Sequence, residues 1–317
     1  MSDYAWRVSN VLAVDAEPPQ RQPVPLYPRR RLRQLALPEL RLSPGQALRF
    51  RFCLGRELGE RNSILGQVMQ PSIRFAYETR VAAALPDCEP ESEADRRLLE
   101  QIRDTKARSL HIAGHNLLFT AEEVEAFFGA TTEPVSPSDL RHGLTGTQAL
   151  ADLAALVRRG VQGDVVTSAE LADALQRLRE SRQAAGLMRT ARLFQAYMDA
   201  VANAINLRLD TRAICLQPQP TRTARIAETV FHRFYVEQLQ PDLAEVQRAL
   251  ARLDQAVLAA LQATPAPPSN ALMRYVHASQ ALHQDLVAAS RRHAQAWQRL
   301  LGQCGRMPDR SDSDLPS

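Results

Sequence analysis

Apolar side chains recur every three to four residues along most of the chain. Such a period places them on one face of an α-helix. The clearest stripes are Leu171, Leu175 and Leu178, then Phe194, Met198, Val201 and Ile205. These two stripes do not join in phase, so we expect a bend or break near Gly186. We find no alternating pattern of strand type longer than a few residues, and the sequence therefore predicts an all-α protein.

Polar residues and prolines mark where several of these helices begin. Ser43 before Pro44 predicts an N-cap for a helix that continues toward Asn62. Gly66 can end that helix. The other expected starts are Pro71-Ser72 and two capping boxes, Thr120 with Glu123 and Thr167 with Glu170. Residues 131–146 lack such a pattern, and we expect a loop there.

Proline sets the character of the N-terminal region. Six prolines between Pro18 and Pro38 exclude a regular helix. We expect residues 26–42 to run extended over a surface, held by apolar anchors at Leu32, Leu35, Leu37, Leu40 and Leu42.

At the C-terminal end, residues 242–263 carry a near-heptad repeat of apolar residues, and Pro241 should kink or restart the helix before it. A short linker then leads to a last long helix over residues 271–301. That arrangement predicts antiparallel neighbours in a helix bundle.

These elements suggest a division of the chain. We expect an N-terminal helical part over residues 1–130, which includes the proline-rich segment, and a helical bundle over residues 131–305. The two should pack as one unit, and residues 306–317 should form a disordered tail.

Charge and composition bear on the class of partner. The formal net charge is +4, aromatic residues make up 5% of the 317 positions, and Lys106 is the only lysine. The one dense basic cluster, Arg29-Arg30-Arg31-Leu32-Arg33, is expected to be a solvated segment. A nucleic-acid binder usually gathers lysine and arginine on one face among stacking aromatics, so we expect no nucleic-acid partner. An arginine-rich cytoplasmic nucleic-acid binder is the third and weakest hypothesis.

The four cysteines bear on the compartment. Cys53 with Cys88, and Cys215 with Cys304, are spaced like two loop-closing disulfides and not like a metal site or a Cys-x-x-Cys redox motif. Four buried reduced thiols are the alternative. No stretch of 18 apolar residues exists, so we expect no transmembrane helix, and the first residues lack the profile of a signal peptide. A removed export signal would reconcile that start with disulfides.

The segment over residues 59–72 is the least ordinary in composition. Arg61 and Asn62 could bond the last carbonyls of a helix, and Glu60 or Glu78 could pair with Arg61, which would make the segment a structural corner. The candidate functional surface is Arg61, Asn62, Ser63, Ser72, Tyr77 and Glu78. Ser63 lacks the Gly-x-Ser-x-Gly turn of a serine nucleophile, and we predict no catalytic residue and no cofactor.

Histidines give no convincing metal site. His111 and His115 lie four residues apart on one predicted helix face, a spacing that suits two metal ligands. No third ligand is evident nearby. His232, His277, His283 and His293 are scattered along the C-terminal helices, and we predict no metal site.

Three separated motifs together resemble a known family. They are Glu60-Arg61-Asn62-Ser63-x-Leu65-Gly66-x-Val68-Met69-x-Pro71-Ser72, then Phe231-x-x-Phe234-Tyr235 before Gln240-Pro241, and finally His293-x-x-x-Trp297 before Cys304. The chain resembles, over nearly its whole length, an uncharacterised proteobacterial lipoprotein family, domain of unknown function 3080. That resemblance implies export into an oxidising compartment, which agrees with both disulfides. It also implies a lipid anchor in the full-length precursor, on a segment not seen in this sequence, and it brings no catalytic residue or cofactor.

We therefore expect a non-enzymatic protein on the periplasmic face of the bacterial envelope, lipid-anchored in its native precursor. Its partner would be an envelope protein or another envelope component. The alternative hypothesis is an envelope hydrolase with a site near Arg61, Ser63 and Tyr77.

Overall fold

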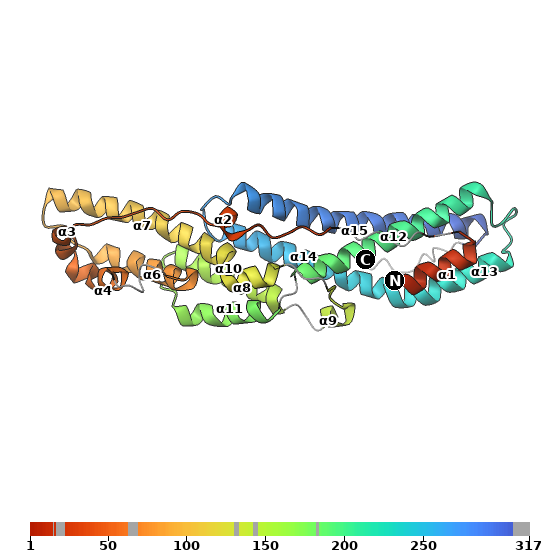
Figure 1. Ribbon diagram of the computed structural model, residues 1–317, viewed down its shortest axis with the longest axis horizontal. Coiled ribbons are helices and arrows are strands. Elements are labelled where there is room, and N and C mark those ends of the chain that lie inside the picture. Colours follow the sequence, from red (N-terminus) through yellow and green to blue (C-terminus); the bar gives the residue numbers. More distant parts are fainter. Residues whose placement is uncertain are drawn as a thin grey trace, which may run out of the picture.

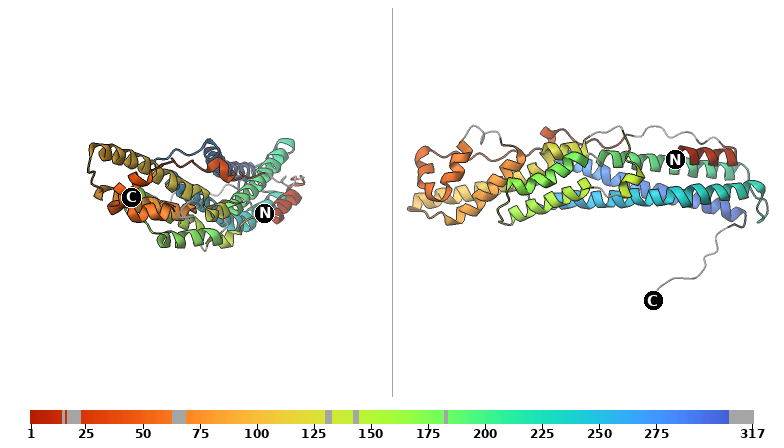
Figure 2. Two further views of the ribbon diagram at one scale, coloured as in Figure 1. Left: turned by 60° about the vertical axis from the view of Figure 1, so that its left-hand side comes forward. Right: turned by 90° about the horizontal axis from the view of Figure 1, so that it is seen from below.

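The computed structural model describes residues 1–14, 16, 23–62, 69–129, 133–141, 145–181 and 184–306. Within these ranges every regular element is a helix, so the expected all-α class is confirmed. The molecule is elongated: the helices over residues 44–120 lie toward one end, and the helix over residues 2–12 lies with the long C-terminal helices at the other (Figure 1). A second view from below shows the same elongated form (Figure 2).

Two long helices, α12 (Ala184–Thr211) and α15 (Asn270–Gln303), lie side by side. Polar contacts join them in steps, from Arg192 to Asp285, from Arg292 to Asp199 and from Arg299 to Asn206. Each pair is separated by 93 positions in the sequence. A constant difference in number requires that the two helices run parallel and in register, because antiparallel helices would keep the sum constant instead.

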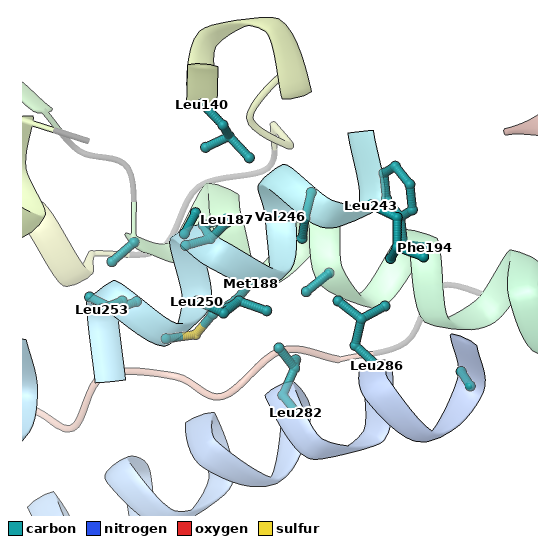
Figure 3. Packing of buried hydrophobic residues seen from close by; sticks show 14 of the residues in the cluster. Leu140, Leu187, Met188, Phe194, Leu243, Val246, Leu250, Leu253, Leu282 and Leu286 are labelled. Carbon is teal, nitrogen blue, oxygen red and sulfur yellow. The ribbon is translucent and has the colours of Figure 1, made fainter. Parts of the chain in front are cut away.

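The chain returns between these two helices as a further helical run. That run consists of α13 (Arg222–Val230), a π-helical segment (Phe231–Leu239) and α14 (Gln240–Gln262). Pro241 lies in the first turn of α14, as expected, where a missing N–H costs no helical hydrogen bond. Residues 263–269 then turn the chain into α15, antiparallel to α14 (Figure 1). Leucines of α14 and α15 meet side chains of α12 in the core (Figure 3).

The other end of the molecule is a helical hairpin. Here α6 (Pro71–Ala84) and α7 (Glu93–Thr120) are joined by a 3-10 turn at Leu85–Asp87. Against it lie α3 (Pro44–Arg49) and α4 (Arg51–Asn62), and a disulfide between Cys53 and Cys88 ties α4 to the hairpin. This end has its own small core, made of Phe50, Leu54, Tyr77, Val81, Leu85, Cys88, Leu99 and Ile102.

The remaining helices pack on the bundle or between it and the hairpin. They are α1 (Ser2–Leu12), α8 (Glu122–Phe128), α9 (Pro137–Arg141), α10 (Thr145–Val161) and α11 (Ser168–Ser181). The first helix, α1, packs on α12 and α13, so the beginning of the chain lies on the bundle formed by its second half. α10 contacts α7, α11 and α14, and the large core therefore runs continuously from the hairpin into the bundle.

An extended segment runs along the molecule over α7 (Figure 1), and we call residues 23–42 the strap. Only one turn of it is helical, α2 (Arg30–Arg33), as the prolines predict. Asn116 of α7 fixes the strap through its side-chain amide, which donates to the carbonyl of Leu35 and accepts from its N–H, both at 2.9 Å.

Two expectations about the strap are wrong. Arg33 was expected in a solvated segment, yet it is 0% exposed and bonds the carbonyls of Pro28 and Phe119 and the carboxylate of Glu125. Its guanidinium also lies 4.0 Å from the ring centre of Tyr27. Leu32 was expected as an apolar anchor and is exposed instead. The single helical turn of α2 points the side chain of Arg33 inward and leaves the side chain of Leu32 exposed.

Helix boundaries confirm some expectations and correct others. The cap at Ser43 and the capping box of Thr167 with Glu170 are both present. The helix expected from Ser43 to Asn62 is interrupted at Phe50, and Thr120 is not a cap, since its hydroxyl donates to the Asn116 carbonyl inside α7.

Two further expectations about helix boundaries differ from the structure. The break expected near Gly186 falls earlier, between α11 and α12, so that Gly186 lies inside α12. The loop expected over 131–146 contains α9 and the start of α10. Gly66 and residues 307–317 of the expected tail lie outside the described residues, while Arg306 is described and pairs with Glu228 at 2.8 Å.

Candidate functional site

A cavity of about 460 Å³ lies between the strap and the helices α3, α6 and α7, and we call it the strap pocket. Its described lining residues are Leu37, Pro38, Glu39, Leu40, Arg41, Leu42, Ala47, Arg74, Tyr77, Lys106 and Ser109. The volume is that of a typical small-molecule site. Apolar residues of the strap and α3 thus face basic and aromatic residues of the hairpin.

The floor of the pocket is a buried ionic cluster. Glu78 is 1% exposed and accepts from Nη2 of Arg74 at 2.6 Å and from Nζ of Lys106 at 3.2 Å. Both cations also lie near the Tyr77 ring, with Arg74 at 5.6 Å and Lys106 at 4.8 Å from its centre. A carboxylate this deep needs compensating charge, because removal from water costs several kcal/mol.

Helical spacing explains why these groups meet. Arg74, Tyr77 and Glu78 are three and four positions apart on α6, so they share one face of that helix. Lys106 comes from α7, the other arm of the hairpin, and reaches across to the same face. The only lysine of the chain is therefore committed to this cluster.

The opposite wall belongs to the strap. Leu37, Leu40 and Leu42 are half-buried, and the last two pack against the small core at this end. Arg41 and Glu39 pair with each other at 2.8 Å and are largely exposed. The pocket therefore has an apolar wall, a cationic floor and a neutral ion pair on the strap.

The lining shows what the pocket can do chemically. Guanidinium and ammonium groups beside an aromatic ring suit the binding of a carboxylate or phosphate. Ser109 donates its hydroxyl to the carbonyl of Thr105 at 2.9 Å, within its own helix. No described lining residue pairs that hydroxyl with a general base, so the geometry supports binding better than nucleophilic catalysis.

The structure brings together some of the predicted residues. Tyr77 lines the pocket, whereas Glu78 is not among the described lining residues but pairs with two of them, Arg74 and Lys106. Ser72 is half-buried near the start of α6 and is not among the described lining residues. Arg61 and Asn62 end α4, but their side chains lie outside the described part, and so does the whole of Ser63. The structure therefore does not test the hydrolase site.

Arg74 and Lys106 were not predicted as site residues. Lys106 carried one signal, since it is the only lysine among 39 basic residues. Arg74 carried none, because Arg-x-x-x-Glu is an ordinary pair on a helix surface.

A second cavity, of about 590 Å³, lies between α10 and α14. Its described lining consists of Thr145, Thr147, Gln148, Ala151, Arg252, Gln255, Ala256 and Ala259. Only one of these residues is charged. We favour the smaller strap pocket because several ionisable groups converge there.

The described histidines that make polar contacts bind different partners. Nε2 of His115 donates to the carbonyl of Arg33 at 3.0 Å, and burial lowers the pKa of both His115 and His111. His283 instead pairs with Asp254 at 2.8 Å. Across the described residues, no group of three or more His, Cys, Asp or Glu is placed to hold a metal ion.

A second buried polar cluster lies on the bundle. The Tyr4 hydroxyl lies 2.9 Å from Nε2 of His293 and accepts from Nε1 of Trp297 at 2.8 Å. Tyr235, from the π-helical segment, packs its ring 4.3 Å from that of His293. The cluster is closed to solvent, since His293 is 0% exposed, and it fastens α1 to α15.

Two findings concern the membrane and the relatives of this chain. Among the described helices, none has the length and apolarity needed to cross a bilayer. A family model described as "Protein of unknown function (DUF3080)" matches residues 1–308. The comparisons with curated proteins and with solved structures gave no match.

Proposed function

This chain belongs to the DUF3080 family, and we propose that it is a non-enzymatic binding protein of the bacterial cell envelope. We place it on the periplasmic face, held by a lipid anchor on the full-length precursor. The strap pocket is its binding site, and its partner is an envelope protein or another envelope component.

The paired cysteines carry the proposed location. Cys53 bonds Cys88 and Cys215 bonds Cys304, with Cα–Cα distances of 5.3 and 5.2 Å, so no cysteine is left unpaired. Disulfides persist in oxidising compartments and are rare in the cytosol. Closing loops of 35 and 89 positions contributes about 4 and about 5 kcal/mol by chain entropy. Either value is a large part of a domain's net stability, about 5 to 15 kcal/mol.

The strap pocket supports binding as the role. A buried Glu78 with two basic partners is costly to build, and replacement by apolar residues would often stabilise such a site. The same cluster borders a cavity that the strap covers on one side. A charged cluster beside a cavity of ligand size is a common arrangement in binding sites.

The location is tested by mapping thiols in the native host. Cells are treated with an alkylating reagent before and after reduction, and the peptides of the envelope and cytosolic fractions are compared. We expect the protein in the envelope fraction with all four cysteines protected until reduction. Free thiols on a cytosolic protein would contradict the proposed location.

The partner is tested by photocrosslinking at the pocket. A photoreactive residue replaces Arg41, which is exposed and lines the pocket, and in a control it replaces Arg97, exposed on the same hairpin. We expect an envelope component to be trapped at position 41 and not at position 97. Equal trapping at both positions would show that the strap pocket is not the binding site.

A further inference from the structure

We propose that the strap pocket binds an amphipathic anion, which carries one carboxylate or phosphate group on an apolar chain. The anionic group lies at Arg74 and Lys106, and the chain lies along the leucines of the strap. This inference rests on the proposed function in one respect only, the choice of the strap pocket as the binding site.

The charges of the pocket select an anion. Three of its described lining side chains are basic and one is acidic. On the strap, Arg41 and Glu39 neutralise each other. At the floor, Arg74 and Lys106 both pair with the carboxylate of Glu78. The described lining therefore has more basic than acidic side chains, and it favours the binding of an anion over that of a cation.

One side-chain donor of Arg74 makes no hydrogen bond. Its Nη2 pairs with Glu78, whereas its Nε–H is buried and has no hydrogen-bond partner. A buried donor left without an acceptor costs about 1 to 3 kcal/mol. An oxygen of a bound carboxylate or phosphate would recover part of that cost once the guanidinium turns toward it, because these groups accept from two arginine nitrogens at once.

The wall of the pocket selects an apolar chain. Leu37, Leu40 and Leu42 are only half-buried, so they retain apolar surface that a ligand can cover. Pro38 of the strap and Ala47 of α3 extend the same wall. Each Å² of apolar surface removed from water contributes about 25 cal/mol. An inorganic anion would leave this wall uncovered.

The size of the pocket restricts the class of ligand. A cavity of about 460 Å³ accommodates a small molecule or one short alkyl chain. The strap forms one wall of this cavity, whose volume is too small for a folded protein element. We therefore commit to a single-chain amphiphile.

The first experiment measures binding to the purified full chain by isothermal titration calorimetry. The probes are dodecanoate and dodecyl phosphate, each below its micelle concentration, with dodecanol, acetate and inorganic phosphate as partial ligands. We expect at least one anionic amphiphile to bind about tenfold or more tighter than each partial ligand. The tighter of the two distinguishes a fatty-acid-like headgroup from a phosphorylated one. Equal binding of dodecanol, or of inorganic phosphate alone, would overturn the proposal.

The second experiment places the ligand in the strap pocket. Lys106→Gln should weaken binding about tenfold, the loss of one charge-assisted hydrogen bond. Arg108→Gln is the matched control, since it removes the same charge from an exposed position two residues along α7. Undiminished binding by Lys106→Gln, or an equal loss in both variants, would overturn the proposal.

A third variant leaves the ionic cluster intact. Ala47→Phe should fill the cavity from α3 and weaken the amphiphile about tenfold, while Arg74, Glu78 and Lys106 keep their contacts. If circular dichroism shows that Lys106→Gln fails to fold, the Ala47→Phe variant tests whether the ligand binds in the strap pocket. Full binding by a folded Ala47→Phe variant would place the ligand elsewhere.

These results separate the two proposals. A cytosolic protein with free thiols that still binds dodecanoate would refute the envelope location alone. A protein that traps an envelope partner at position 41 but binds no amphiphile would refute the ligand class alone.

Discussion

Arg33, Glu78 and His293 are among the ionisable side chains that are almost completely removed from solvent. Each is compensated differently. Arg33 is bonded to two backbone carbonyls and Glu125, Glu78 has two basic partners, and His293 is uncharged. Buried polar groups of this kind fix the relative positions of the elements that meet at them, because losing a partner leaves an unsatisfied group.

Arg33→Met tests the contribution of the buried guanidinium. The variant keeps an unbranched side chain but leaves the carbonyl of Pro28 without its donor, and the carbonyl of Phe119 keeps only the hydroxyl of Tyr27. We expect the free energy of unfolding to fall by about 3 kcal/mol, measured by urea denaturation. Arg31→Met is the control, since Arg31 is exposed, and should change stability by less than about 0.5 kcal/mol. Equal effects would contradict the burial of Arg33.

His293 makes stability depend on pH. Burial lowers its pKa from 6.5 to about 3, so the folded state disfavours protonation while the unfolded state accepts a proton below pH 6.5. The contribution is therefore complete above pH 6.5 and declines as pH falls toward 3. Between pH 7 and pH 5 it amounts to a loss of about 2 kcal/mol.

The measurement is urea denaturation at pH 7 and pH 5 of the native chain and His293→Phe. The variant should lose less stability on acidification, by about 2 kcal/mol. Burial also lowers the pKa of His115, and that contribution of the same sign remains in both proteins. An identical pH dependence would show that His293 is protonated without cost in the folded state.

At the scale of elements, contacts between distant segments fix the geometry. The strap has almost no helical hydrogen bonds of its own, and Asn116 provides two bonds to Leu35 from α7. The π-helical segment likewise places Tyr235 against His293 of α15, and π-helical turns are frequent at functional positions. In both cases the contacts that position the element lie on a different helix.

Asn116→Ala tests the attachment of the strap. Both backbone groups of Leu35 lose their partner, and the N–H and carbonyl become free to open toward water. We expect faster hydrogen exchange across residues 34–42 and a loss of about 1 to 2 kcal/mol in unfolding free energy. Asn203→Ala, at an exposed position of α12, should alter neither. Unchanged exchange in the strap would mean that its other contacts hold it without Asn116.

At the scale of the whole molecule, one disulfide lies at each end of an elongated fold. Cys53–Cys88 closes the hairpin end, and Cys215–Cys304 joins the segments that follow α12 and α15 (Figure 1). The parallel alignment of α12 and α15 explains the second bond, since it brings their C-terminal ends together. The small core at the hairpin end has less apolar surface to stabilise it than the continuous core of the bundle.

Removing each disulfide should therefore have different consequences. Cys53→Ala with Cys88→Ala is expected to loosen the hairpin end, with faster hydrogen exchange in α4 and α6 while the bundle stays protected. Cys215→Ala with Cys304→Ala is expected to lower the stability of the bundle itself, by about 5 kcal/mol. Loss of protection along the whole chain in the first variant would show that the two ends unfold as one cooperative unit.

Several features follow from the sequence alone because they depend on neighbouring residues. Apolar stripes identify the long helices, the Ser43 and Thr167 caps mark helix starts, and the prolines exclude a regular helix from the strap. The number and spacing of the cysteines favour the two pairs over reduced thiols but do not fix them, and both disulfides are present in the structure.

Other features depend on the tertiary structure, because they join residues far apart in the sequence. The burial of Arg33 requires a carbonyl and a carboxylate that lie 86 and 92 positions away. Lys106 meets Glu78 across 28 positions, and the parallel pairing of α12 with α15 spans 93. Local periodicity shows which face of a helix is apolar but not which distant helix covers it. The sequence therefore does not predict the strap pocket, which forms only where the hairpin and the strap meet in the fold.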